Sequence, residues 1–231
     1  MSEPVVLLPG MMCDARLFAP QIAALSATRA VMVVPLADGD NFTSMAASIL
    51  RHAPPRFALA GLSMGGIAAM EVIRQAPRRV TRLALMDTNP LAEAPDRAQL
   101  REAQIARVLG GALTAVIRDD MKPHYLAAGS DRRTILDLCM DMAVALGPDI
   151  FASQSRALQS RPDQCDTLRG IDVPTLILHG AEDRLCPRER HELMRDLVPG
   201  AILVSIDNAG HLPTLEQPQP TNEALERWLT L

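Results

Sequence analysis

The chain has 231 residues, of which 48% are apolar and 22% are charged, and its formal net charge is −4 at pH 7. This balance is that of a folded globular protein, and the absence of a basic excess argues against general binding to nucleic acid. No apolar run approaches the roughly 18 residues that a membrane-spanning helix needs. We therefore expect one large domain or two small ones, with neither nucleic acid nor membrane as a partner.

Short apolar runs alternate with longer helical patterns along the chain. We predict strands at about 5–8, 31–34, 57–60, 80–86, 175–178 and 202–205, and helices at about 15–27, 43–52, 64–75, 187–197 and 221–229. Apolar strands separated by helices are typical of a parallel sheet covered on both faces. The sequence thus predicts an α/β fold with an open, mostly parallel, doubly wound sheet of about six strands. Functional residues should follow the carboxyl ends of these strands.

Residues 88–170 interrupt this alternation. No strand is predicted there, and helical patterns cover about 95–109, 112–118, 132–146 and 149–159, separated by glycines and by Gly147-Pro148. A separate helical domain is one interpretation. The flanking strands look like members of one sheet, so we favour a helical cap over its functional edge. The predicted organisation is a core of residues 1–87 and 171–231 with a cap insertion of residues 88–170.

The segment Gly61-Leu62-Ser63-Met64-Gly65 has the pattern G-x-S-x-G between a predicted strand and a predicted helix. A serine on such a sharp turn exposes its hydroxyl, and the residues two before and two after it crowd together and must be small. The helix that follows favours developing negative charge. An inert serine in a glycine-rich turn is the alternative. A phosphate-binding turn would need G-x-x-x-x-G-K-[ST] or G-x-G-x-x-G, and neither is present. We predict that Ser63 is a nucleophile.

A serine nucleophile needs a base, and five histidines are available. His211 follows the last predicted strand, in a loop with glycine before it and proline after it, and is the expected base. An ordinary loop histidine is the alternative. The others fit other roles: His52 and His124 at the surface, His191 on a charged helical face, and His179 close to the core.

The acid that orients the base should also follow a strand. Asp183 comes just after the strand at 175–178, where a carboxylate could hold the imidazole tautomer. A turn or helix-capping aspartate is the alternative interpretation. Asp87 is the second candidate, because it too ends a predicted strand, and Glu182 is expected to point elsewhere.

The order Ser63, Asp183, His211 resembles that of the α/β-hydrolase fold superfamily. Gly61–Gly66 is similar to its nucleophile elbow, Gly180–Asp183 to its G-x-x-D acid turn, and Gly210-His211 with Glu216-Gln217-Pro218 to its G-H-x-x-x-x-E-x-P ending. The resemblance covers nearly the whole chain. It implies a serine hydrolase with a Ser-His-Asp triad that needs no metal or organic cofactor.

The resemblance also implies an oxyanion hole made by the backbone N–H groups of Met64 and Met11. Relatives commonly carry His-Gly-X after the first strand, whereas this chain has Pro9-Gly10-Met11, which leaves the shape of that loop open. Many relatives also have two further strands before the strand that leads into the oxyanion loop. Here that strand is predicted at 5–8, and only residues 1–4 precede it.

The substrate implied is a small carboxylic ester or related acyl compound. Lactonase, C–C bond hydrolase and menaquinone-pathway-type lyase activities share the same triad, and a non-catalytic, hydrolase-like ligand sensor is the alternative of another class. An aspartate nucleophile, as in epoxide hydrolases and haloalkane dehalogenases, is disfavoured by Ser63. Four scattered cysteines with no C-x-x-C pair, and no signal-like start, lead us to expect a cytoplasmic protein with reduced thiols.

Overall fold

The computed structural model describes residues 2–129 and 132–231; residues 1, 130 and 131, which fall in the predicted core and cap ranges, lie outside the described residues. Six parallel strands form one sheet in the order β2-β1-β3-β4-β5-β6. They are β1 (Val5–Leu8), β2 (Val31–Val33), β3 (Phe57–Leu62), β4 (Val80–Met86), β5 (Thr175–Gly180) and β6 (Ile202–Ile206). This confirms the predicted open parallel sheet. The strand order changes direction between β1 and β3, and such a switch point is where open α/β sheets bind ligands.

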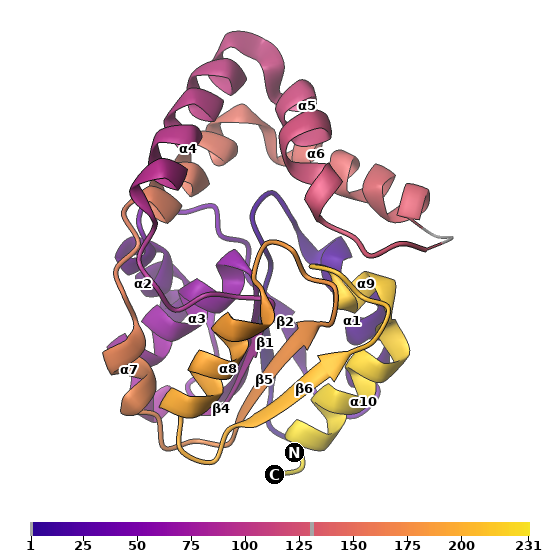
Figure 1. The fold of residues 1–231 in the computed structure, drawn as a ribbon. Helices are drawn as coiled ribbons and strands as arrows, with labels where there is room; N and C mark the ends of the chain where they lie inside the picture. The colour runs from indigo at the N-terminus through magenta and orange to yellow at the C-terminus, as the bar shows by residue number, and fades with distance from the viewer. Residues whose placement is uncertain (1, 130–131) are drawn as a thin grey trace.

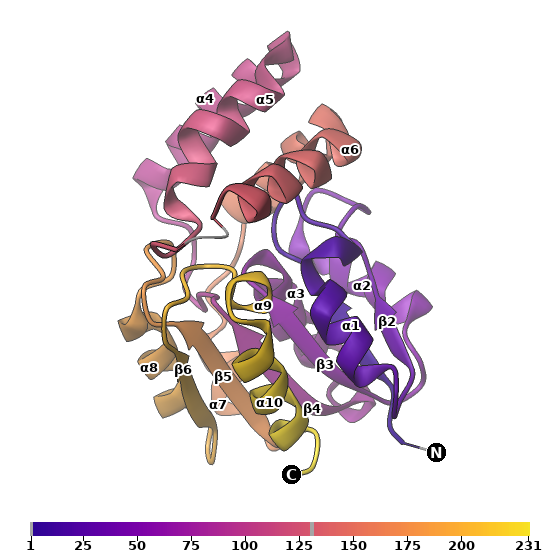
Figure 2. The same ribbon diagram turned by 90° about the vertical axis from the view of Figure 1, so that its right-hand side faces the viewer.

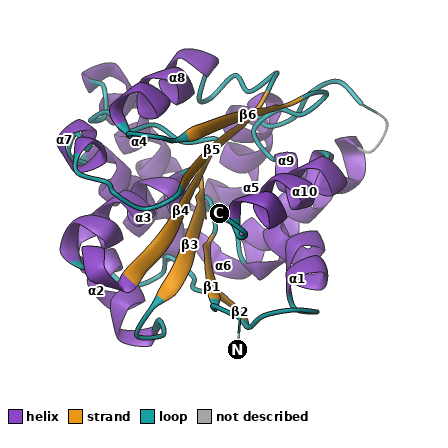
Figure 3. Cartoon of the chain, turned by 90° about the horizontal axis from the view of Figure 1, so that it is seen from below, coloured by secondary structure: helices purple, strands orange, loops and turns teal. Residues whose placement is uncertain are grey.

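Helices cover both faces of the sheet (Figures 2 and 3). Side chains alternate along each strand, so Phe57 and Leu59 of β3 join one apolar core, whereas Ala58 and Ala60 join the other. The first core is closed by α2 (Phe42–His52), α3 (Met64–Gln75), α7 (Cys165–Arg169) and α8 (Arg188–Leu197), and the second by α1 (Ala19–Leu25), α9 (Pro213–Glu216) and α10 (Pro218–Trp228). The four central strands, β1, β3, β4 and β5, are largely buried on both faces, which explains their continuous apolar runs.

The helices of residues 95–159 lie above the carboxyl ends of the strands (Figure 1). They are α4 (Pro95–Arg107), α5 (Leu113–Ala115) and α6 (Arg132–Gln159), with wider π-helical turns at Val108–Ala112 and Val116–Met121 and a 3₁₀ turn at Lys122–His124. Ile105, Val116 and Phe151 share an apolar cluster with Met12, which follows β1. This segment is therefore packed onto the edge of the sheet where the candidate site lies.

The local differences from the predicted elements have identifiable causes. The two helices predicted at 132–146 and 149–159 form the single helix α6, broken at Gly147, whose φ of 82° is in the region that favours glycine. The first predicted helix is divided into a 3₁₀ turn (Ala15–Phe18) and α1, with Pro20 in the first turn of α1. No strand occurs among the described residues 88–129 and 132–170, as predicted. No helix in the described ranges is long and apolar enough to cross a membrane.

Candidate active site

Ser63 lies in the turn between β3 and α3 with an unusual backbone conformation. Its φ of 55° and ψ of −116° fall outside the regions that L-residues ordinarily adopt. The Ser63 N–H donates to the carbonyl oxygen of Met86 at 2.8 Å, and the Ser63 carbonyl oxygen accepts the hydroxyl of Thr88 at 2.7 Å. A strained residue persists only where its surroundings hold it, and these bonds to β4 and its loop do so.

The glycines around this serine are required by close packing. A Cβ on Gly61 would overlap the carbonyl group of Gly65, and a Cβ on Gly65 would overlap the carbonyl group of Leu8. A Cβ on Gly66 would lie 2.6 Å from the Cβ of Thr88. The pattern G-x-S-x-G-G therefore lets α3 begin in direct contact with β1 and with the loop after β4.

The imidazole of His211 lies between Ser63 and Asp183. Its Nε2 is 2.9 Å from Ser63 Oγ, and its Nδ1 is 2.9 Å from Asp183 Oδ2. His211 is 5% exposed and Asp183 is 8% exposed, so little water competes for either bond. With the proton on Nδ1, the lone pair of Nε2 can accept the serine hydroxyl proton. The structure thus brings together the three residues predicted from separate motifs.

Asp183, not Asp87, contacts His211. The other carboxylate oxygen of Asp183 accepts the backbone N–H groups of Leu185 at 2.8 Å and Cys186 at 3.1 Å. Burial raises the pKa of Asp183, but the His211 imidazole and these backbone donors outweigh it, so the pKa is lowered overall. Asp183 therefore stays ionised where an imidazolium would form.

Asp87, the second candidate for the acid, lies behind this carboxylate. It is fully buried, and its Oδ1 accepts the N–H of Gly180 at 2.8 Å, which joins the end of β4 to the end of β5. Burial, with the nearby Asp183 carboxylate, raises the pKa of Asp87 well above its usual value. A neutral Asp87 fits this position, because two ionised carboxylates at such a buried place would repel each other.

Glu216 holds the loop that carries His211. Its carboxylate accepts the backbone N–H groups of Gly210 at 2.9 Å and Leu212 at 3.0 Å, on either side of the histidine, and that of Ala127 at 2.8 Å. Burial raises the pKa of Glu216, and these donors act against that rise. Its place in the C-terminal motif could be read from the sequence, but this anchoring role could not.

The loop after β1 lies against the serine, as an oxyanion loop requires. A Cβ on Gly10 would be 3.5 Å from Ser63 Cβ, an ordinary contact. The N–H groups of Met11 and Met64 donate no hydrogen bond to any residue in the described ranges, so both are available to a ligand. Met12 has a φ of 56°, and its N–H donates to the side chain of Gln154 in α6. No sequence motif indicates that Gln154 holds this loop.

His191 is buried, which corrects its expected place on a charged helical face. It is 0% exposed and stacks on His179, with ring centroids 4.8 Å apart. Its Nε2 accepts the N–H of Thr88 at 3.2 Å, and burial lowers its pKa to about 4. Because Thr88 also bonds to Ser63, this neutral imidazole supports the nucleophile turn from behind. The places predicted for three other histidines are confirmed, because His179 is buried and His52 and His124 are exposed.

Among the described residues, one group has side chains of metal-ligand type close together. The ligand atoms of Asp183, Cys186 and His211 lie within 4.8 Å of one another. The carboxylate and the imidazole already bond to each other, and the imidazole also bonds to Ser63. These hydrogen bonds account for the close approach of the three side chains.

Comparison with known proteins assigns the chain to a family. Residues 5–224 match the family model described as alpha/beta hydrolase family. The chain is 25% identical over 203 residues to the pimeloyl-[acyl-carrier protein] methyl ester esterase of Aromatoleum aromaticum, covering 79% of this chain and 78% of that protein. The chain belongs to the alpha/beta hydrolase family, and this curated relative is named as an esterase.

Solved structures agree with this assignment. A thermophilic esterase from Thermogutta terrifontis, in a malate-bound structure, superposes with a TM-score of 0.90 at 27% identity, covering 100% of this chain and 90% of that one. The enol-lactonase from Burkholderia xenovorans LB400 superposes with a TM-score of 0.88 at 22% identity, covering 100% and 91%. The latter likeness concerns the fold.

Proposed function

We propose that the chain hydrolyses small carboxylic esters through a Ser63–His211–Asp183 triad and an acyl-enzyme intermediate. The observation that carries this proposal is the His211 imidazole, 2.9 Å from both Ser63 Oγ and Asp183 Oδ2. Serine is a poor nucleophile at neutral pH unless a base takes its proton, and this geometry supplies the base and its orienting acid.

In the first half of the reaction, Ser63 Oγ forms a bond to the ester carbonyl carbon while its proton passes to His211 Nε2. Asp183 stabilises the imidazolium that results. The N–H groups of Met11 and Met64 donate to the oxyanion, a type of contact that is worth about 3 kcal/mol for each donor. The bond to the leaving oxygen then breaks, and His211 returns the proton to the departing alcohol.

In the second half, a water molecule attacks the acyl carbon while His211 Nε2 takes one of its protons. Collapse of this second tetrahedral intermediate breaks the bond to Ser63 Oγ, which regains its proton from His211. The products are a carboxylic acid and an alcohol, and the enzyme returns to its starting state. Every proton moves through one imidazole, which is why its two short contacts support the proposal.

We further propose that residues 88–170 act as a cap that selects the substrate. The described helices of this segment pack above the carboxyl ends of the strands, and Tyr125 lies with its ring centroid 6.4 Å from that of His211. The segment carries many arginines and aspartates, which favours a smaller and more polar substrate than that of a lipase.

A panel of p-nitrophenyl esters of graded chain length, extended with lactones and with substrates for C–C cleavage, tests this proposal. We expect hydrolysis of short esters by the wild type, loss of at least 10³-fold in kcat for Ser63→Ala, and unchanged rates for Ser26→Ala, an exposed serine that serves as the control. A Ser63→Ala variant with full turnover would refute the proposal. Saturable ligand binding without an acyl-enzyme burst would point to the ligand-sensor alternative.

A further inference from the structure

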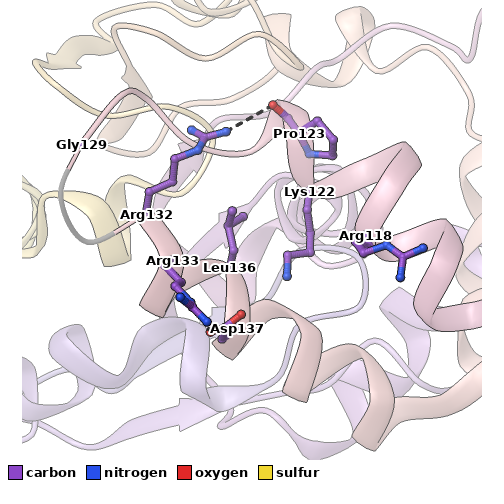
Figure 4. A pocket seen from close by; sticks show the side chains of 8 residues that line it. All are labelled: Arg118, Lys122, Pro123, Gly129, Arg132, Arg133, Leu136 and Asp137. Carbon is purple, nitrogen blue, oxygen red and sulfur yellow. Dashed lines mark hydrogen bonds and ion pairs between the residues drawn. The ribbon is translucent and has the colours of Figure 1, made fainter.

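A cationic cavity lies in the segment above the sheet, away from the three residues of the proposed triad. It has a volume of about 540 Å³ and is lined by Arg118, Lys122, Pro123, Gly129, Arg132, Arg133, Leu136 and Asp137. Figure 4 shows Arg118, Lys122 and Pro123 on the turns before residue 125, Gly129 in the loop that follows, and the other four residues on the first turns of α6. A volume of this size is within the range of small-molecule sites, which is about 300–1,000 Å³.

Lys122 is the unusual residue of this cavity. It is the sole lysine of the chain beside 22 arginines. Its side chain extends into the space between Arg118 and Arg133 (Figure 4), although the residue is only 9% exposed. Its ammonium group makes no ion pair or hydrogen bond with any residue that the structure describes. The aliphatic stem of Lys122 is buried, whereas its ammonium reaches the cavity, where a cation with no paired carboxylate attracts an anion.

The other charges around the cavity do not satisfy this ammonium. The Arg118 guanidinium is bonded to Asp119 at 2.7 Å and 2.8 Å, and Arg132 donates to backbone carbonyl groups, that of Ala127 at 2.9 Å among them. Among the lining residues that the structure describes, Asp137 has the one carboxylate, and its Oδ2 lies 3.9 Å from Nε of Arg133, whose side chain is 95% exposed. Among the described lining residues, four cations therefore lie near one carboxylate, and Lys122 has no paired carboxylate while Arg133 has a long, exposed one.

The cavity wall continues into the loop of the proposed base. Three residues after Lys122, the carbonyl oxygen of Tyr125 accepts the backbone N–H of His211 at 2.7 Å. The N–H of Ala127 donates to Glu216, which also holds the residues on both sides of His211. A ligand bound at Lys122 would therefore contact the chain segment that positions the imidazole.

We propose that Lys122, with Arg133, binds the carboxylate group of a small organic acid in this cavity, with Leu136 and Pro123 contacting its apolar carbons. The carboxylate has two sources, the far end of an acyl substrate or a free acid such as a reaction product. The carboxylate from either source would make the same contacts with Lys122 and Arg133. The comparison of esters described below distinguishes the two sources. Binding of the free acid does not depend on the proposed reaction, whereas the ester comparison rests on it.

The direct test measures binding of the dicarboxylates succinate, glutarate and pimelate to the whole chain by calorimetry, at constant ionic strength. We expect saturable binding by the wild type and by Lys122→Arg, and a Kd at least tenfold weaker for Lys122→Met. The matched control is Arg156→Met, which removes an exposed cation of α6 outside the cavity and should bind as the wild type does. Wild-type affinity in Lys122→Met, or no binding of any of the three acids to the wild type, would overturn the site.

A second measurement needs no variant, because a single lysine makes amine labelling specific. We expect acetylation of Lys122, followed by peptide mass mapping, to slow at least fivefold under saturating dicarboxylate, while acetylation of the N-terminal amine is unchanged. An unchanged labelling rate at Lys122 would overturn the proposal even if Lys122→Met failed to fold.

Esters then identify the source of the carboxylate. The comparison pairs monomethyl esters of dicarboxylic acids with neutral methyl esters of equal length. If the substrate supplies the carboxylate, KM is lower for the charged ester, and Lys122→Met removes that advantage whereas Arg156→Met keeps it. If a free acid is the ligand, the paired KM values are equal and the calorimetric binding persists. Failure of the proposed hydrolysis would be recognised separately, as an absence of turnover on every ester with binding intact.

Discussion

The side chain of Gln154 accepts the backbone N–H of Met12 at 2.8 Å, across 142 positions of the chain. Its amide nitrogen donates to the carbonyl oxygen of Leu36 at 3.0 Å, so one residue of α6 fixes two loops at the edge of the sheet. Met12 follows the proposed oxyanion donor Met11 and has a φ of 56°. The position of that donor therefore depends on a contact from the segment above the sheet.

This contact predicts the behaviour of Gln154→Ala. Without the amide, the Met12 N–H loses its partner in a buried place, and the Met11 N–H is no longer held toward the oxyanion. We expect kcat on a short p-nitrophenyl ester to fall about 10- to 100-fold, with little change in KM. This is less than the roughly 10²- to 10³-fold for removal of an oxyanion donor, because the Met11 N–H is displaced and not removed. Gln159→Ala, on the same helix, should change kcat less than twofold. Equal rates for the two variants would contradict this role of Gln154.

The acid assignment predicts a sharp difference between two aspartates. Asp183→Asn should lower kcat by about 10³- to 10⁴-fold, because an amide neither holds the same imidazole tautomer nor stabilises the imidazolium. Asp87→Asn should lower kcat by less than about tenfold, since an asparagine resembles the neutral carboxyl that burial favours and can still accept the Gly180 N–H. Steady-state kinetics on one ester would decide, and the reverse order of effects would transfer the role of acid to Asp87.

Close packing at the nucleophile turn predicts that Gly65→Ala does not fold normally. A Cβ at this position would overlap the backbone carbonyl of Leu8, which cannot move without displacing β1. We expect a loss of more than about 4 kcal/mol in the free energy of unfolding. Gly110→Ala is the matched control, because nothing lies within 4 Å of its added Cβ and alanine favours a helix. Denaturant unfolding of both variants measures the difference, and a stable Gly65→Ala would refute the packing argument.

Burial of His191 predicts a dependence of stability on pH. Its pKa is lowered from 6.5 to about 4. Between these two pH values the imidazole is protonated in the unfolded chain but neutral in the folded chain. The stability that His191 contributes is complete above pH 6.5 and is lost as the pH falls, by about 2 kcal/mol at pH 5. The free energy of unfolding of His191→Gln should fall less than that of the wild type between pH 7 and pH 5. Parallel pH profiles would contradict a buried neutral imidazole.

The fold and the central residues could be predicted because their signals are local. Each strand is a continuous apolar run, and Ser63, Asp183 and His211 each follow one of these runs within a recognisable turn. Parallel strands bring their carboxyl ends to one edge, so the three residues were expected to meet. The break of α6 was likewise visible in Gly147-Pro148, although its two halves form one element.

The supporting residues could not be predicted because their roles depend on how distant elements pack. His191 lies in a stretch of charged residues and is nonetheless buried by the approach of α8 to His179 of β5. In the sequence, Gln154 is one of several polar residues in a predicted helix. Its role depends on the packing of α6 over the loop after β1. The cavity around Lys122 arises from the turns before residue 125 and the start of α6, and no pattern in the sequence places those two segments together.

The most direct test of the whole account is covalent labelling with a fluorophosphonate, read by peptide mass mapping and by the rate of adduct formation. The account predicts a single adduct on the peptide that contains Ser63, absent in Ser63→Ala and formed at least 10³-fold more slowly in His211→Ala. An adduct on another residue, or labelling of His211→Ala at the wild-type rate, would contradict it.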